Sequence, residues 1–205
     1  MTPRRPQAAL GLRAHSGWAA LVAVGGGPAS PQVLDRRRIE MADGPEAKQP
    51  YHAAEDLPLA RAQALLDRFA RVAQERAAAG LGAALADLRA DGYDVAGVIV
   101  LTASGKPLPG LESVLASHAL IHTADGEHFR TALAFAGKHH RVPVARIREK
   151  DLVAQAAKAL GRAAPALQAT VTAWGKPLGP PWTQDQKLSA LSAWLGLVLP
   201  AASYS

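Results

Sequence analysis

Two short apolar segments near the beginning of the chain constrain its fold more than any other feature. The stretch ALGLRAHSGWAALVAV, residues 9–24, places strand-compatible residues on both sides of a short polar segment. Such an arrangement is typical of a β-hairpin. After a turn rich in glycine and proline, the segment QVLDRRRIEM, residues 32–41, predicts a third strand. Because its alternation of apolar and polar residues is imperfect, we expect this third strand at the edge of a sheet.

Helices and strands alternate through the rest of the chain. A helical pattern runs from Pro58 to about Ala90, and Gly80 and Gly82 predict a break or kink within it. The apolar segment DVAGVIVLTAS predicts a strand that is covered on both faces. We therefore expect an α/β fold with a mixed sheet and helices on its faces. The remaining predictions are a polar loop over 42–57, helices over 111–122 and 125–140 with Asp125 as a cap, a strand over 141–147 and a helix over 149–161. Over 165–182 we expect a short helix and then the turn-rich GKPLGPPW, and the final helix starts from Thr183.

The length of 205 residues favours one domain. We place this domain at residues 9–199, between a short basic arm (1–8) and a tail (200–205). The chain has no cysteine, which excludes disulfides and thiolate metal sites and fits a reducing cytoplasm. We see no secretory signal, and the apolar run at 188–199 is much shorter than the roughly 20 residues of a membrane helix. The sequence predicts a cytoplasmic protein that does not enter a membrane.

Positive charge is concentrated in one segment of the chain. The formal net charge is +6 and the pI is about 10.0. Residues 130–162 contain eight Lys and Arg residues against two acids, a surplus equal to the net charge of the whole chain. Such a region suits contacts with phosphates, although a solvated arginine-rich surface has the same composition. The candidate nucleic-acid-binding residues are Arg130, Lys138, Arg141, Arg146, Arg148 and Lys150.

The order of the elements resembles that of the ribonuclease-H-like superfamily, in particular the branch of RuvC-type junction resolvases. The resemblance covers residues 9–199 and rests on GLRAHSGWAALVAV as the first hairpin, GVIVLTAS as the central strand and DQKLSALSAWLGL as the closing helix. It implies a site where carboxylates from the first strand, the end of the central strand and the last helix hold two metal ions. In such a site the metals bind the phosphate oxygens and activate water.

The carboxylates of that site are largely missing here. Arg13 stands at the first-strand position, and the central strand ends in Thr102, Ala103 and Ser104. The last helix offers Asp185, with Lys187 where a second acid is expected. One carboxylate cannot hold two magnesium ions, so the sequence favours a degenerate site that lacks a metal cofactor.

The opposite charges of Arg13 and Asp185 lead to a specific structural prediction. We predict that Arg13 faces the last helix and pairs with Asp185, because a buried carboxylate is costly unless a cation satisfies it. The alternative is that Arg13 points to solvent and Asp185 only supports the start of its helix, where Thr183 and Gln186 have the spacing of a capping box.

Histidines provide an alternative chemistry. His118 and His122 are four residues apart and share a face of a helix, as two zinc ligands can. His128 follows, together with Asp125 and Glu127, but no HExxH motif is present. A metal-dependent hydrolase or nuclease that uses these residues and a divalent metal is therefore one alternative function. A scaffold that binds a protein partner is another.

Other motifs are weaker. Ser104 and Lys106 lie after the central strand, but their surroundings match neither a phosphate-binding loop nor a nucleophile elbow. The tetrapeptide GKPL recurs at 105–108 and 175–178, and we expect a loop at both places. Trp18 and Trp194 are expected in the core. The sequence thus favours a non-catalytic ribonuclease-H-like protein that binds nucleic acid, or a partner associated with nucleic acid, through the basic segment.

Overall fold

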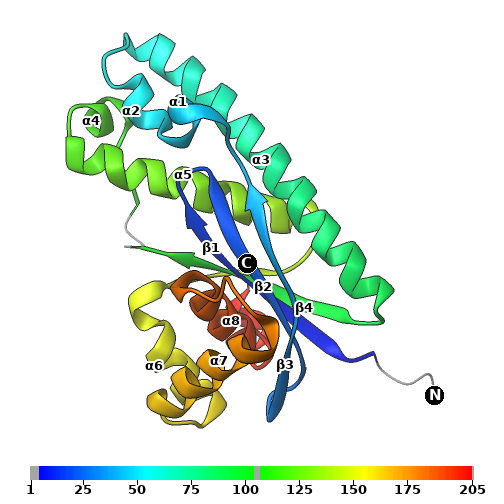
Figure 1. Ribbon diagram of the computed structural model, residues 1–205. Helices are drawn as coiled ribbons and strands as arrows, with labels where there is room; N and C mark the ends of the chain where they lie inside the picture. Colours follow the sequence, from blue (N-terminus) through cyan, green and yellow to red (C-terminus); the bar gives the residue numbers. More distant parts are fainter. Residues whose placement is uncertain (1–4, 104–106, 205) are drawn as a thin grey trace.

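The computed structural model describes residues 5–103 and 107–204, and its central element is a mixed five-stranded sheet (Figure 1). The strands lie in the order β3-β2-β1-β4-β5. The first three pair in antiparallel fashion, whereas β4 is parallel to β1 and β5 is parallel to β4. This confirms the predicted mixed sheet, the edge position of the third strand and the interior position of the apolar strand. The strands are β1 (Gln7–His15), β2 (Trp18–Gly27), β3 (Ser30–Glu40), β4 (Asp94–Thr102) and β5 (Val144–Arg148).

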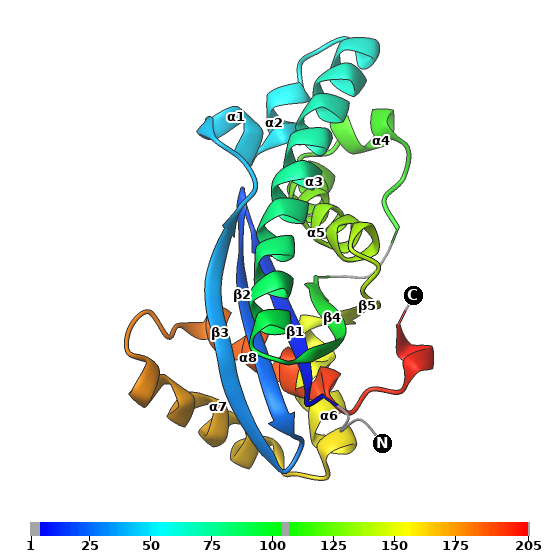
Figure 2. The same ribbon diagram turned by 90° about the vertical axis from the view of Figure 1, so that its right-hand side faces the viewer.

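Helices cover both faces of the sheet (Figure 2). The helices α3 (Leu59–Ala90) and α5 (His118–His139) pack on one face, and α6 (Glu149–Leu160), α7 (Ala164–Leu178) and α8 (Gln184–Gly196) pack on the other. Three short helices, α1 (Gly44–Lys48), α2 (Pro50–Ala54) and α4 (Leu111–Leu115), gather near the beginning of α3 and of α5, beyond the sheet. A single 3₁₀ turn, Ala201–Ser203, follows α8.

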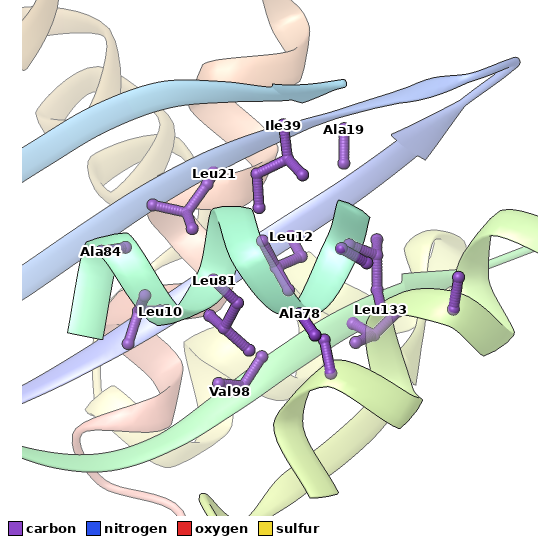
Figure 3. Close-up of a cluster of buried hydrophobic side chains, with 14 of the residues drawn as sticks. Leu10, Leu12, Ala19, Leu21, Ile39, Ala78, Leu81, Ala84, Val98 and Leu133 are labelled. Atoms are coloured by element: carbon purple, nitrogen blue, oxygen red, sulfur yellow. The ribbon is translucent and has the colours of Figure 1, made fainter. Parts of the chain in front are cut away.

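Alternating side chains of the sheet divide between two cores. Leu10, Leu12 and Leu21 point toward α3 and α5, where they meet Leu81 and Leu133 (Figure 3). On the other face, the fully buried Trp194 of α8 occupies the second core, as predicted for this residue. Each large side chain buried in this way contributes about 1.5–3 kcal/mol to folding.

Gly11 allows α8 to lie directly on β1. A Cβ atom at Gly11 would lie 1.9 Å from the backbone oxygen of Ser189 and 2.2 Å from Oγ of Ser192. Only glycine permits so close an approach of helix and strand. Arg13 follows Gly11 by two residues and so shares its face of β1, which faces α8.

The predicted break in α3 is absent, and the helix is continuous from Leu59 to Ala90. Its two glycines instead allow neighbouring side chains to pack closely against the helix. A Cβ atom at Gly80 would lie 2.7 Å from Cγ2 of Ile39, and one at Gly82 would lie 2.9 Å from the ring of His140. Tertiary packing therefore outweighs the weak helix propensity of glycine, about 1 kcal/mol per residue.

Three further local predictions are wrong. Residues 42–57 are not simply a loop, because they contain α1 and α2. Asp125 does not cap a helix, since α5 runs through it without interruption. The GKPL copy at 175–178 ends α7 rather than lying in a loop, while the copy at 105–108 falls partly outside the described residues. The helix α2 packs on α3 through Ala54. The Asp125 carboxylate binds the Tyr51 backbone and the His52 ring instead of a helix end.

The last described residue belongs to the packed structure. The ring of Tyr204 fills the space above Gly97, and its hydroxyl donates a hydrogen bond to the backbone oxygen of Gly196 at 2.9 Å. Burial raises the pKa of Tyr204 to about 12. No helix within the described parts of the chain is long and apolar enough to cross a membrane.

Candidate functional site

The carboxyl ends of three parallel strands lie side by side at one end of the sheet. Arg13 of β1 is paired with Leu101 of β4, and Leu101 is paired with Ile147 of β5. Because β5 passes almost directly into α6, Glu149 in the first turn of α6 lies at the same end of the sheet. Ligands bind at this end in open α/β sheets, which makes it the candidate functional site.

Arg13 binds two carboxylates from two different helices. Its Nε donates to Oε2 of Glu149 at 2.9 Å and its Nη2 donates to Oε1 at 3.1 Å, which is the bidentate geometry that favours guanidinium–carboxylate pairs. Its Nη1 donates to Oδ1 of Asp185. The hydrogen bond to Glu149 raises the pKa of Arg13, against the opposing effect of burial. The predicted Arg13–Asp185 pair is confirmed, and Arg13 does not point freely to solvent.

Asp185 is held by its own helix and by β1. The capping box of Thr183 and Gln186 forms as predicted and fixes the first turn of α8, which contains Asp185. His15 of β1 also contacts the Arg13–Asp185 pair. Its Nε2 lies 2.8 Å from Oδ1 of Asp185 and 2.9 Å from Nη1 of Arg13. Burial alone would raise the pKa of Asp185, but the hydrogen bond from His15 and the charge of Arg13 outweigh it and hold this pKa below its usual value.

The residues at this end of the sheet do not fit a pair of magnesium ions. The two acids, Glu149 and Asp185, already share one guanidinium, whose positive charge would repel a divalent cation. At the end of β4 the buried Thr102 provides only a hydroxyl, and Ser104 lies outside the described residues. Lys187 lies elsewhere, at a cavity of about 260 Å³ lined by residues of α6, α7 and α8. These side chains form an ion-pair cluster and do not provide the set of oxygen ligands that a magnesium site needs.

The comparisons with known proteins agree with this architecture. No protein-family profile and no curated protein matches the chain. The chain is similar to two solved structures of Thermus thermophilus RuvC, one of them in complex with a Holliday junction substrate. The fold is ribonuclease-H-like. The TM-scores are 0.51 and 0.50 at 12% and 13% sequence identity, and each match covers 92% of this chain and 91% of the other.

The predicted basic residues lie on α5, in the turn after it, on β5 and at the beginning of α6. Arg130 and Arg146 both reach Glu127, and Arg148 binds Asp151 at 2.5 Å. The other three make no ion pair with any residue that the structure describes. We call the five exposed members of this segment the basic strip: Lys138, Arg141, Arg146, Arg148 and Lys150.

A groove lies beside the ion-pair cluster, on the side of β3. Its volume is about 360 Å³, and Asp185 contributes to its wall. Trp18 lines this groove rather than the core where the sequence placed it, with its ring stacked between two neighbours. The His15 ring is parallel to it at 4.4 Å, and the Arg38 guanidinium lies 3.9 Å from its centre. The groove is lined by Trp18, Arg36, Arg37, Arg38, Pro181, Thr183, Asp185 and Gln186.

The histidines are arranged differently from the sequence-based hypothesis. His118 and His122 do meet, but their third neighbour is His52 of α2. His128 lies elsewhere, half-buried beside Tyr51 and Phe129, and burial lowers its pKa. The carboxylate of Glu127 forms an ion pair with the guanidinium of Arg146. Ser104 and Lys106, the other candidates, lie outside the described residues.

Sequence analysis missed Glu149, His15 and His52. Glu149 carries a signal in retrospect, since it is an acid that directly follows a strand and begins a helix. His15 lies two residues after Arg13 and therefore shares its face of β1. His52 has no comparable signal, because nothing in its segment marks it as a neighbour of a helix that begins more than 60 residues later.

Proposed function

We propose that this chain is a ribonuclease-H-like protein that binds nucleic acid and does not use two-metal hydrolysis. The observation that carries the proposal is the position of the Arg13 guanidinium between Glu149 and Asp185. A fixed cation there neutralises the acids that a nuclease would present to metal ions. The fold can then retain a surface for nucleic acid without the chemistry, since fold and activity are separable.

The surfaces beside the ion-pair cluster support a nucleic-acid ligand. The basic strip follows the edge strand β5, and Lys138, Arg141 and Lys150 are exposed cations without an ion pair among the described residues. The groove on the other side offers arginines around the Trp18 ring. These cations can provide the phosphate contacts that are typical of nucleic-acid binding. The similarity to a RuvC structure with a bound Holliday junction is consistent with a branched DNA ligand.

The salt dependence of binding tests the proposal. Anisotropy of a labelled four-way DNA junction, a DNA duplex and a single-stranded RNA is measured from about 50 to about 200 mM salt. We expect a linear fall of log K with log salt, because bound cations release counterions from the phosphates. Binding that does not depend on salt, or no binding to any of the three at the lowest salt, would contradict the proposal.

Charge-removal variants locate the contact. Replacing Lys138, Arg141 and Lys150 together by alanine is expected to reduce the salt slope by up to about 3 and to weaken binding at least about tenfold at low salt. The matched control replaces three exposed arginines of α3, Arg61, Arg68 and Arg71, which removes the same charge from outside the basic strip. Equal losses in both triple variants would show that net charge rather than the basic strip governs binding.

A further inference from the structure

Three histidines from two helices converge beyond the end of the sheet. His52 lies in α2, and His118 and His122 lie one turn apart at the beginning of α5. One ligand nitrogen from each of the three lies within 4.8 Å of the others. The Nε2 atoms of His118 and His122 are only 3.1 Å apart. The rings meet edge to face, with centres 4.5 Å apart for the pairs His52–His122 and His118–His122.

A buried carboxylate orients one of the three rings. Asp125 is 6% exposed and lies on α5, one turn after His122. Its Oδ2 is 2.5 Å from Nδ1 of His52, and its Oδ1 accepts a hydrogen bond from the backbone N–H of Tyr51 at 2.7 Å. With Nδ1 of His52 bound to the carboxylate, Nε2 is the nitrogen that would bind a metal. A carboxylate that holds the far nitrogen of a ligating histidine is a recurrent feature of metal sites, where it fixes the tautomer and the ring.

The spacing suits a small tetrahedral ion. Zinc binds imidazole at about 2.0–2.1 Å, which places the ligand nitrogens roughly 3.3 Å apart. The His118–His122 separation already matches this value. His118 and His122 are exposed, so their side chains can rotate to close the remaining distance to His52.

We propose that His52, His118 and His122 form a zinc site, with Asp125 as the residue that positions His52. Imidazole ligands favour zinc over magnesium or calcium. Three protein ligands leave a fourth position open for water or another ligand. The bound ion joins α2 to α5 and thereby stabilises the part of the molecule that extends beyond the sheet (Figure 1). The small apolar cluster of Ala54, Ala62 and Leu66 packs α2 against α3 in the same region. This site is separate from the Arg13 cluster, and neither proposal depends on the other.

Zinc titration of the full chain without an affinity tag tests the site. Calorimetry is expected to show one equivalent of zinc, and cobalt in its place is expected to give the visible absorption of a tetrahedral complex. His52→Ala, His118→Ala and His122→Ala should each weaken zinc binding by at least tenfold. Asp125→Asn should weaken it about 10–100-fold, because its carboxylate acts through His52.

The matched control is His139→Ala, which removes an exposed histidine from the other end of α5. Its zinc affinity should remain within threefold of the wild-type value. Circular dichroism identifies variants that fail to fold, and His118→Ala and His122→Ala are decisive in any case because both side chains are exposed. Absence of stoichiometric zinc in the wild type would overturn the proposal. So would a loss below tenfold in either exposed variant, or an equal loss in the control.

Discussion

Arg13 of β1 and Glu149 of α6 form a bidentate ion pair, with distances of 2.9 and 3.1 Å between their nitrogen and oxygen atoms. The two residues are 136 positions apart in the sequence and meet because β1, β4 and β5 end at the same level of the sheet. Since Asp185 binds the same guanidinium, one cation holds the first strand and the beginnings of two helices together.

Removal of this cation should destabilise the fold. In Arg13→Ala, Glu149 and Asp185 lose their shared partner and repel each other. The Arg13 side chain is 22% exposed, so solvent screens part of the effect, and we expect a loss of about 1–3 kcal/mol in the free energy of unfolding. Urea unfolding measures this loss. Arg13→Lys retains the charge but not the bidentate geometry and should recover only part of it. A change below about 0.5 kcal/mol in Arg13→Ala would show that the cluster is not stabilising.

The close approach of α8 to β1 makes Gly11 a sensitive position. Gly11→Ala places a methyl group where the backbone of Ser189 now lies, so α8 must move away from the sheet. We expect a loss of about 2–3 kcal/mol in the free energy of unfolding, together with a weaker Arg13–Asp185 pair. Gly27→Ala is the matched control, because no atom lies within 4 Å of its added Cβ, and it should change stability by less than about 0.5 kcal/mol. Similar losses in both variants would contradict the role of Gly11.

The half-buried His128 should make the free energy of unfolding depend on pH. Burial lowers its pKa below the ordinary value of about 6.5, although the charge of Asp125 opposes the shift. The unfolded chain therefore binds a proton at a higher pH than the folded chain does. The stability contributed by the neutral ring is fully present above about pH 6.5 and falls as the pH drops toward the folded pKa. Urea unfolding between pH 7 and 5 should show a smaller decline for His128→Leu than for the wild type. Equal declines would show that other groups cause the dependence.

These relationships were accessible from the sequence to different degrees. The hairpin, the apolar strand and the capping box at Thr183 depend on local patterns, and all three were predicted correctly. The Arg13–Asp185 pair followed from charge balance at positions that the resemblance aligned. The contact with Glu149 depends on the register of three parallel strands, which no local pattern encodes. The roles of Asp125 and His52 were missed for a similar reason: an acid before an apolar run resembles a helix cap, and only the folded chain brings the backbone of Tyr51 to it.

Restoring an acid at position 13 should not create a nuclease. Arg13→Asp removes the cation, but it leaves the hydroxyl of Thr102 rather than a carboxylate at the end of β4, and it leaves the Arg130 charge close to Glu149. We expect no cleavage of a labelled four-way junction with magnesium or manganese. Arg13→Asn, which removes the charge without adding an acid, is the control. Metal-dependent cleavage by Arg13→Asp alone would show that position 13 was the sole defect.

Binding and cleavage of a four-way DNA junction by the wild-type protein are measured in one sample that contains magnesium. Native gels report the bound fraction and denaturing gels report the intact strands. We predict a complex that dissociates as salt increases and whose strands remain uncut. Cleavage products that disappear in Asp185→Asn would contradict the proposed role of Arg13, because Asp185 would then bind a metal rather than Arg13.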